Sequence, residues 1–397
     1  MSRGVVVTGI GCVGPYGLGR QALAAALAAG VPCASPVDRA TGYHRRHAAH
    51  LAGRCAGLDF SPWLSPQAAR RMSDLSQYTV TACRMAMQDA GLADVRGDGT
   101  AIVVATAHGP GGFTEQLARQ ILEKGGKAAS PFLFTDCVAN AAAGQAGIDL
   151  GARGPNVTIC QREAGPLLAL AQGATEIARG RADLCFAGAA DEIDPLVHAI
   201  LDRFRAIARP TAAGELPRPF DRRRNGALAA AGATMLVLEA EDRARARGAT
   251  ILARVGKTVR AFDPTASRAG FGRDPQGLAA ALRDGFGHEL DGVDVVVSGA
   301  SGTRSGDSLE AAVLHAALPR LPAVVAPKAV HGEYGGGTLA AGVLAVVGAP
   351  FAAPPACGEP DPALRIRLAP RAEPARTALL SAHAGGGAAS WTLLHAP

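Results

Sequence analysis

Aromatic side chains are scarce in this sequence. Phe, Trp and Tyr together make up 4% of the 397 residues, although hydrophobic residues as a whole reach 48%. The chain contains 50 glycines, so we expect an interior that depends on close backbone packing and on aliphatic side chains. No stretch rich in proline or serine is long enough to link separate domains, which predicts one continuous body with two lobes.

Ordered cysteine motifs, clustered basic charge and membrane segments are also missing. The eight cysteines form no CxxC pair and no regular spacing, which argues against a zinc site or a disulfide framework and indicates a reducing compartment. The formal net charge is +6, but the basic residues are too dispersed for a nucleic-acid footprint. Prolines and glycines interrupt the longest uncharged run, residues 334–358, and no signal-peptide pattern is visible. We therefore expect a soluble, cytoplasmic protein that binds no nucleic acid, membrane, metal or other cofactor.

The stretch Gly154–Gly165, GPNVTICQREAG, organises the chain. A β-branched strand runs into a polar turn, and a helix rich in small residues is expected at Pro166–Arg179. This layout is typical of a nucleophile held at a buried helix N-terminus. Glu163 stands where a nucleophile would be expected. A carboxylate that took up an acyl group would form an anhydride, which is too reactive to store that acyl group. The turn therefore predicts either an unusual enzyme or the inactive shell of one.

A rival interpretation comes from the glycine pattern near the N-terminus. Residues Gly9–Gly14 read GIGCVG and match the GxGxxG pattern of dinucleotide-binding proteins. In such a site the helix starts inside the glycine motif, where its free N–H groups meet the pyrophosphate. Here the helix is expected only from about Arg20, and the acidic Asp38 lies in a polar loop. The dinucleotide-binding alternative is weak but remains open at this stage.

Three segments together resemble the β-ketoacyl synthase family of the thiolase fold. They are Gly154–Gly180, the opening VVVTGIGCVGPYGLG (Val5–Gly19) and PRPFDRRRNGALAAAGATMLVLE (Pro217–Glu239). The resemblance implies an α/β, thiolase-like fold with a duplicated five-layer α-β-α-β-α architecture, and we place its two lobes at residues 1–245 and 246–397. The expected strand Val293–Ala300 mirrors that at Ala101–Ala107, as a duplication would require.

The family's catalytic groups can be carried over position by position. In the family a cysteine holds the acyl chain, and two histidines polarise the malonyl thioester. Glu163 replaces the cysteine. The first histidine, eight residues before Asp307, is replaced by Gly299, and the second is replaced by Glu333. The family's lysine is retained as Lys328.

Other features of the expected site follow from the same alignment. The family's C-terminal gate loop has become His383–Ala388, with Ala384 in place of the gate phenylalanine and Ala388 in place of an asparagine. Cys160 lies three residues before the nucleophile position and is poorly placed to replace it. We interpret His331 and His383 as hydrogen-bonded structural histidines.

Buried carboxylates are costly unless they are paired. We therefore expect Glu163, Glu333 and Lys328 to form an ionic cluster that fills the old cavity. The alternative is a Glu163 side chain that points into solvent-filled space.

Because it has lost the cysteine and both histidines, the chain resembles the chain-length factor, the non-catalytic ketosynthase-like subunit of type II polyketide synthases. Its members carry QAG where this chain has EAG at Glu163–Gly165, which indicates a divergent branch, such as one that makes reduced or polyene chains. The resemblance implies a heterodimer with a catalytic ketosynthase, action on an acyl chain carried by an acyl carrier protein, and no condensing activity of the isolated chain. An alternative function is decarboxylation of malonyl-carrier protein, with Glu163 in place of the family's glutamine.

The resemblance also implicates residues 108–121, HGPGGFTEQLARQI, in the acyl-chain tunnel at the dimer interface. Helical spacing puts Phe113, Gln116 and Gln120 on one face of a helix that follows a glycine turn. Ordinary interface packing explains this pattern equally well. Elsewhere we expect one long helix at Ser65–Ala90, an irregular segment at Val31–Pro62 and a strand at Thr250–Val255. For Phe132–Leu150 we expect an extended entry followed by an alanine-rich helix.

Overall fold

The first half of the chain builds a five-stranded mixed sheet. A computed structural model describes residues 3–397. The strands lie side by side in the order β6, β5, β7, β8 and β1; β5 is parallel to β6 and β7, and β8 is antiparallel to β7 and β1. Their bounds are β1 (Val5–Gly14), β5 (Thr100–Ala105), β6 (Asn156–Ile159), β7 (Leu184–Asp191) and β8 (Gly232–Ala240).

The second half repeats this topology. Its strands lie in the order β11, β10, β12, β13 and β9, with β10 parallel to β11 and β12 and with β13 antiparallel to its neighbours. Their bounds are β9 (Ala253–Phe262), β10 (Val295–Val297), β11 (Ala323–Val325), β12 (Thr377–His383) and β13 (Ala388–His395). In chain order both halves read 3-2-4-5-1, so the predicted duplication is confirmed in the topology. The halves meet where β1 pairs with β9 through Val6 and Arg254.

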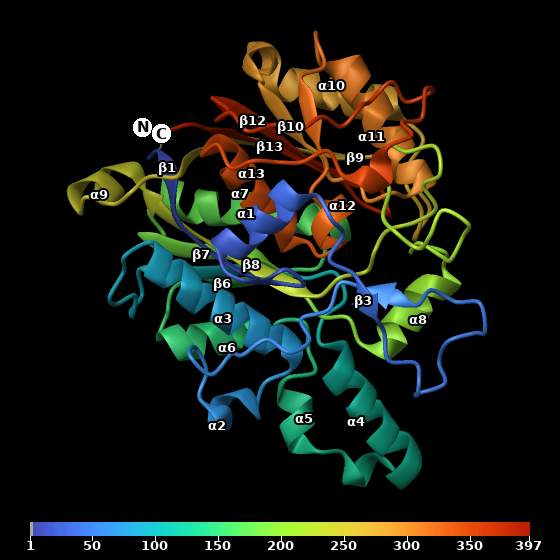
Figure 1. Ribbon diagram of the computed structural model, residues 1–397. Coiled ribbons are helices and arrows are strands. Elements are labelled where there is room, and N and C mark those ends of the chain that lie inside the picture. The colour runs from blue at the N-terminus through green and yellow to red at the C-terminus, as the bar shows by residue number, and fades with distance from the viewer. Residues whose placement is uncertain (1–2) are drawn as a thin grey trace.

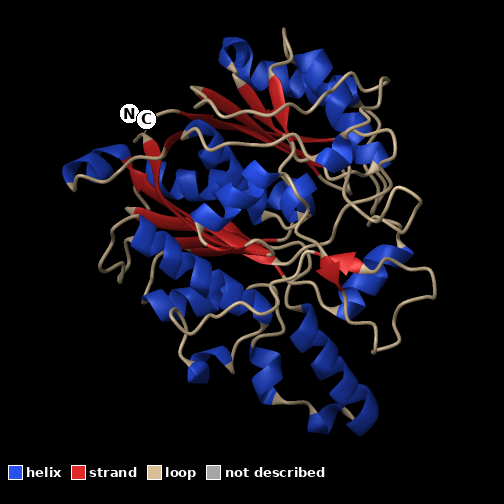
Figure 2. Cartoon of the chain, in the orientation of Figure 1, coloured by secondary structure: helices blue, strands red, loops and turns tan. Residues whose placement is uncertain are grey.

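Helices separate and cover the two sheets. Figures 1 and 2 show helices between the sheets and on both outer faces, which gives the expected five layers. α7 (Gly165–Ala178) and α13 (Gly336–Val346) form the central layer, since each packs on strands of both halves. The outer layers are α3 (Asp74–Asp89) with α6 (Ala141–Leu150), and α10 (Pro275–Phe286) with α11 (Arg304–Ala317).

The remaining elements are short or lie at the periphery. The helices are α1 (Arg20–Ala29), α2 (Pro66–Ala69), α4 (Gly111–Lys124), α5 (Pro131–Thr135), α8 (Pro195–Arg203), α9 (Glu241–Ala246) and α12 (Lys328–His331). The two-residue strands are β2 (Gly17–Leu18), β3 (Ser35–Pro36) and β4 (Leu51–Ala52), and the 3-10 turns are η1 (Gly126–Ala128), η2 (Arg162–Ala164), η3 (Gly287–Gly292) and η4 (Pro355–Cys357). No helix in residues 3–397 is long and apolar enough to cross a membrane.

The glycine motif GIGCVG lies inside β1 and is not a phosphate-binding loop. A Cβ atom at Gly11 would lie 1.8 Å from the Ala82 carbonyl oxygen, and one at Gly9 would lie 2.4 Å from that of Ala86. The glycines therefore let α3 pack directly on the strand. α1 begins only at Arg20, as the sequence indicated, so the dinucleotide-binding interpretation is wrong.

Three of the sequence-based element predictions need correction. The helix expected at Ser65–Ala90 is two helices, α2 and α3, because Ser73 starts a new one and its hydroxyl accepts the Ser76 N–H at 3.3 Å. The stretch around Phe132, expected to be extended, forms the short helix α5. The strand expected at Thr250–Val255 starts later, at Ala253. The lobe boundary between residues 245 and 246 stays a prediction and falls within α9.

Candidate functional site

Glu163 lies in the tight turn η2, directly between β6 and the central helix α7. Its neighbour Arg162 has a positive φ of 43°, which lets the strand turn sharply into the helix. The half-buried Glu163 side chain points across to the β12–β13 turn, where its Oε2 accepts the Gly385 N–H at 3.1 Å. The side chain therefore occupies the junction between the two halves of the fold.

Lys328 and Glu333 form an ion pair at the corresponding place in the second half. Glu333 follows β11 and precedes α13, just as Glu163 follows β6 and precedes α7. The Lys328 Nζ atom is 2.5 Å from the Glu333 Oε1 atom, and only 3% of the lysine side chain is exposed. The Glu333 backbone is fixed by a 2.7 Å hydrogen bond from its N–H to the Leu228 carbonyl. The repeated topology thus brings the two carboxylates to one place.

The space left among these side chains is very small. A cavity of about 10 Å³ has Glu163, Glu333, Glu310, Asp307, His383 and Phe271 among its walls. This volume corresponds to about one water molecule. A thioester substrate does not fit into the cavity as it stands, so the chain's own side chains fill the region that the sequence predicts to be the reaction site.

The charges of this cluster depend on one another. Burial and the nearby charge of Glu333 raise the pKa of Glu163 well above its usual range. Burial alone would lower the pKa of Lys328, but the charges of Glu333, Glu163 and Glu310 outweigh it and raise that pKa. Lys328 therefore stays charged and is the cation of the cluster. Within the described part of the chain Lys328 makes its ion pair with Glu333 and not with Glu163, so the expected three-residue cluster is one ion pair with a second carboxyl group nearby.

Glu310, on α11, is a member of the site that the sequence reasoning missed. It is 2% exposed, burial raises its pKa to about 7, and its Oε1 accepts the Gly299 N–H at 3.2 Å. The sequence feature that could have indicated Glu310 is its spacing of three residues from Asp307, which puts both carboxyl groups on one helix face.

Asp307 accepts hydrogen bonds from the backbone next to the site. Its Oδ2 accepts the Phe220 N–H at 2.9 Å and its Oδ1 accepts the Gly302 N–H at 3.2 Å. Phe220 has a positive φ of 59°, an unusual conformation for a bulky residue. Burial raises the pKa of Asp307 to about 7. Asp307 thus holds the turn of the PRPFDRRRNG segment in place.

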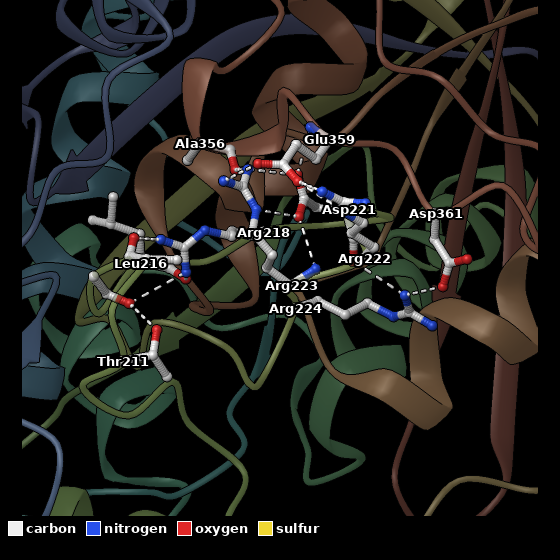
Figure 3. A network of polar contacts seen from close by, with 12 residues as sticks. Thr211, Leu216, Arg218, Asp221, Arg222, Arg223, Arg224, Ala356, Glu359 and Asp361 are labelled. Carbon is white, nitrogen blue, oxygen red and sulfur yellow. Dashed lines mark hydrogen bonds and ion pairs between the residues drawn. The ribbon is translucent and has the colours of Figure 1, made fainter.

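Figure 3 shows how the arginines of that segment lock it to the loop at residues 354–361. The Arg223 Nε atom forms an ion pair with the fully buried Asp221 at 3.0 Å. Arg223 also forms an ion pair with Glu359 at 2.7 Å. Arg224 reaches Asp361 at 2.6 Å. These linked pairs explain the run of three arginines as a structural clamp.

Gly299, which the sequence predicts to stand at the first lost histidine position, has no room for a side chain. A Cβ atom there would lie 2.6 Å from the Ser381 carbonyl oxygen in β12, a backbone atom that cannot swing away. The backbone therefore has to move before any side chain, including an imidazole, can be placed at this position.

We expect Gly299→Ala to lower the free energy of unfolding by about 1–3 kcal/mol, the usual cost of overpacking an interior. Urea denaturation of the purified chain measures this change. Gly292→Ala is the control, since a Cβ atom there meets nothing within 4 Å. Equal stability of Gly299→Ala and the parent chain would show that β12 moves away from the added methyl group at little cost in free energy.

The two nearby histidines do not replace the lost ones. His331 is buried, its Nδ1 is 2.8 Å from the Gly332 carbonyl oxygen, and burial lowers its pKa to about 3. The His383 ring packs edge-on against the Trp391 ring, with 5.3 Å between the ring centroids, and neither of its nitrogens has a hydrogen-bond partner among residues 3–397. The prediction of a hydrogen-bonded structural histidine therefore fits His331 but is wrong for His383. Burial and the charge of Lys328 lower the pKa of His383 to about 3.

The other residues singled out from the sequence lie elsewhere. Cys160 is exposed just after β6. Phe113, Gln116 and Gln120 lie on α4, which projects away from the sheets in Figure 1. The Phe113 ring packs at 6.3 Å from the ring of Phe132. In residues 3–397 no three His, Cys, Asp or Glu side chains are arranged to hold a metal ion.

Comparison with known proteins shows the family. The family model of the β-ketoacyl synthase N-terminal domain matches residues 2–244. The 3-oxoacyl-(acyl-carrier-protein) synthase 2 of Vibrio cholerae serotype O1 is 31% identical over 325 residues, which cover 80% of this chain and 77% of the relative.

Solved structures agree over the whole length. The ishigamide ketosynthase/chain length factor has a TM-score of 0.88 and 27% identity, with 100% of both chains covered. A type II PKS acyl-carrier protein in complex with its ketosynthase bound to the hexaketide also has a TM-score of 0.88 and full coverage, but at 21% identity it shows the fold alone. From its fold, its family model and its relatives, the chain belongs to the β-ketoacyl synthase family.

Proposed function

We propose that this chain is a chain-length factor, which pairs with a catalytic ketosynthase and shapes the tunnel in which the acyl chain grows. The observation that carries the proposal is the filled site. Glu163, Gly299 and Glu333 stand at the positions of the three catalytic groups, and the cavity among them is about 10 Å³. A protein that keeps the fold while filling its own reaction site is better suited to a structural role beside an active partner.

Exposed apolar side chains support a partner on the face formed by α4, α5 and the residue stretch that follows. They are Ile121, Leu122, Phe132, Phe134 and Val138. Leu122 is 86% exposed, which is unusual for a large apolar residue beside other exposed ones. We therefore expect a large apolar interface of about 2,000 Å² or more, the size of obligate complexes.

The sheet edge offers a second surface for the same partner. β6 is the last strand of its half, and among residues 3–397 it pairs with β5 alone, which leaves one side of its backbone without a strand partner there. Ile148, on the neighbouring α6, is 80% exposed. Two of the similar structures, a ketosynthase/chain length factor and an acyl-carrier protein in complex with its ketosynthase, support the two partners that we propose: a ketosynthase subunit and an acyl carrier protein with its acyl chain.

The small cavity counts against the alternative of a malonyl-carrier-protein decarboxylase. Such an enzyme has to admit the malonyl thioester and stabilise the enolate that forms. A cavity with room for about one water cannot admit the malonyl thioester. Gly299 and Glu333, where the family has histidines, supply no imidazole to stabilise the enolate.

Phe113→Ala in the reconstituted complex is expected to shift the products toward longer chains. If the ring is the floor of the tunnel, its removal makes room for several methylenes, each worth about 0.8 kcal/mol when buried. Mass spectrometry of the released acyl chains measures the shift. The exposed Lys124→Ala is the control on the same helix, since Lys124 is not one of the proposed tunnel residues. An unchanged product distribution in an intact Phe113→Ala heterodimer would contradict this role.

A further inference from the structure

Helix α4 carries the proposed tunnel residues but has little apolar packing in this chain. Of its 14 residues, Gly111–Lys124, all within the described part of the chain, only Leu117 is buried. Most of the stability of a protein helix comes from the packing of an apolar face. The position of α4 in this chain therefore depends on the polar contacts that reach it from neighbouring segments.

Polar contacts hold both ends of the helix. At the N-terminal end, the Gly112 N–H donates to the buried Glu192 Oε1 at 2.6 Å. Toward the C-terminal end, the Gln120 Oε1 accepts the Ser130 N–H at 3.1 Å. Gln120 therefore ties α4 to the segment before α5, which is a positioning contact distinct from lining a tunnel.

A third contact holds the middle of the helix and comes from a distant loop. The Tyr43 hydroxyl donates to Glu115 Oε1 at 2.5 Å and accepts from Arg119 at 2.5 Å, while Arg119 also donates to Glu115 at 2.9 Å. Tyr43 thus completes a triangle with two charged side chains one helical turn apart. Hydrogen bonds to charged groups are among the stronger ones in proteins.

The loop that carries Tyr43 joins β3 to β4, and we call residues 37–50 the α4 strap. Its ends are closed by a 2.8 Å hydrogen bond from the Val37 N–H to the His50 carbonyl. The His50 N–H donates to Glu215 at 2.6 Å, and the Ala49 N–H donates to Asp202 at 3.0 Å. The base of the strap is therefore fixed to the body of the protein.

A histidine pair fixes the strap next to Tyr43. The fully buried His198 of α8 donates from Nε2 to the Leu51 carbonyl at 3.1 Å, so its Nδ1 is an acceptor. The His44 Nε2 lies 2.9 Å from that Nδ1 and must be the donor. This pairing requires the His198 ring to be neutral, because its Nδ1 has to be unprotonated to accept the hydrogen bond. Burial lowers the pKa of both imidazoles, in agreement with that requirement.

We propose that Tyr43 is a positioning residue for α4, and that the strap sets the acyl-chain length from outside the tunnel by fixing the helix that carries Phe113. The proposal rests on the proposed function of the chain as a chain-length factor. The strap supplies a rigid point, and the triangle of Tyr43, Glu115 and Arg119 transmits its position to α4.

Hydrogen–deuterium exchange of the isolated chain tests the positioning step. In Tyr43→Phe and in Glu115→Ala, the amides of residues 115–124 are expected to exchange about ten-fold faster, because local opening becomes easier. Glu115→Gln keeps an acceptor for the tyrosine hydroxyl and is expected to exchange like the parent chain. Tyr16→Phe is the matched control, since its hydroxyl contacts Tyr334 far from α4. Unchanged exchange in Tyr43→Phe would overturn the proposal.

Product analysis of the complex with the ketosynthase tests the link to chain length. Tyr43→Phe and Glu115→Ala are expected to broaden the products toward longer chains, and Glu115→Gln is expected to restore the parent distribution. Faster exchange with unchanged products in an intact heterodimer would overturn the link to chain length. If the parent chain itself has no effect on the ketosynthase's products, the proposed function fails, while the exchange measurement still decides whether Tyr43 positions α4.

Discussion

Replacing Lys328 by alanine is expected to lower the free energy of unfolding by about 3–5 kcal/mol, the usual cost of removing one partner of a buried ion pair. The lysine side chain is 3% exposed and contacts Glu333 at 2.5 Å, and the carboxylates of Glu163 and Glu310 add to the negative charge around it. Without the cation, the four carboxyl groups that line the cavity of about one water lose the positive charge that offsets them.

The loss in free energy of unfolding caused by Lys328→Ala should depend on pH. Carboxyl groups whose pKa is raised in the folded state favour the folded chain at low pH, and this stability is lost as pH rises toward the folded pKa. The destabilisation by Lys328→Ala is therefore expected to be largest at neutral pH and to shrink as the pH falls to about 5.

Urea denaturation at the two pH values measures both effects. The double variant Lys328→Met with Glu333→Gln removes the pair together and is expected to recover most of the stability, because buried pairs are often replaceable by uncharged groups. A loss below about 1 kcal/mol for Lys328→Ala, the range of exposed pairs, would show that the cluster is solvated.

Glu163→Cys is expected to leave the chain without condensing activity. A thiol at this position supplies the nucleophile, but Gly299 and Glu333 still lack the imidazoles that polarise the thioester. General acid–base and oxyanion groups each contribute about 10²–10⁴-fold, so we expect a rate about 10⁴-fold or more below that of an intact ketosynthase.

Elongation of malonyl-carrier protein by the pure variant measures this rate, with an intact ketosynthase assayed in parallel and Glu163→Gln as the matched control. Adding Gly299→His is not expected to help, since a side chain there meets the Ser381 carbonyl oxygen. Measurable elongation by the single cysteine variant would show that the filled site keeps its catalytic capacity.

Local sequence signals predicted most of the fold, while the identity of the site positions stays a prediction. The turn into α7 and the start of α1 at Arg20 follow from strand, turn and helix patterns that short segments carry. The resemblance in Gly154–Gly180 indicated that Glu163 replaces the nucleophile. The repeated strand order then explains why Glu163 and Glu333 meet, which the weak internal similarity of the sequence only suggested.

What could not be predicted depends on contacts between distant segments. The GIGCVG motif is read as a strand only when α3 is known to lie against Gly9 and Gly11. The state of His383 depends on Trp391 across the β12–β13 hairpin, and the obstruction at Gly299 depends on β12. Nothing within a few residues of Tyr43 indicates that it reaches Glu115 on α4.

Co-expression with an intact ketosynthase, followed by light scattering of the purified material, tests the central claim most directly. The account predicts a stable one-to-one heterodimer in which the ketosynthase makes acyl chains of defined length. The charge substitutions Leu122→Asp and Ile148→Asp are expected to break it, since both side chains are exposed on the two surfaces assigned to the partner. A chain that stays monomeric, or that self-associates without preference for the ketosynthase, would contradict the account.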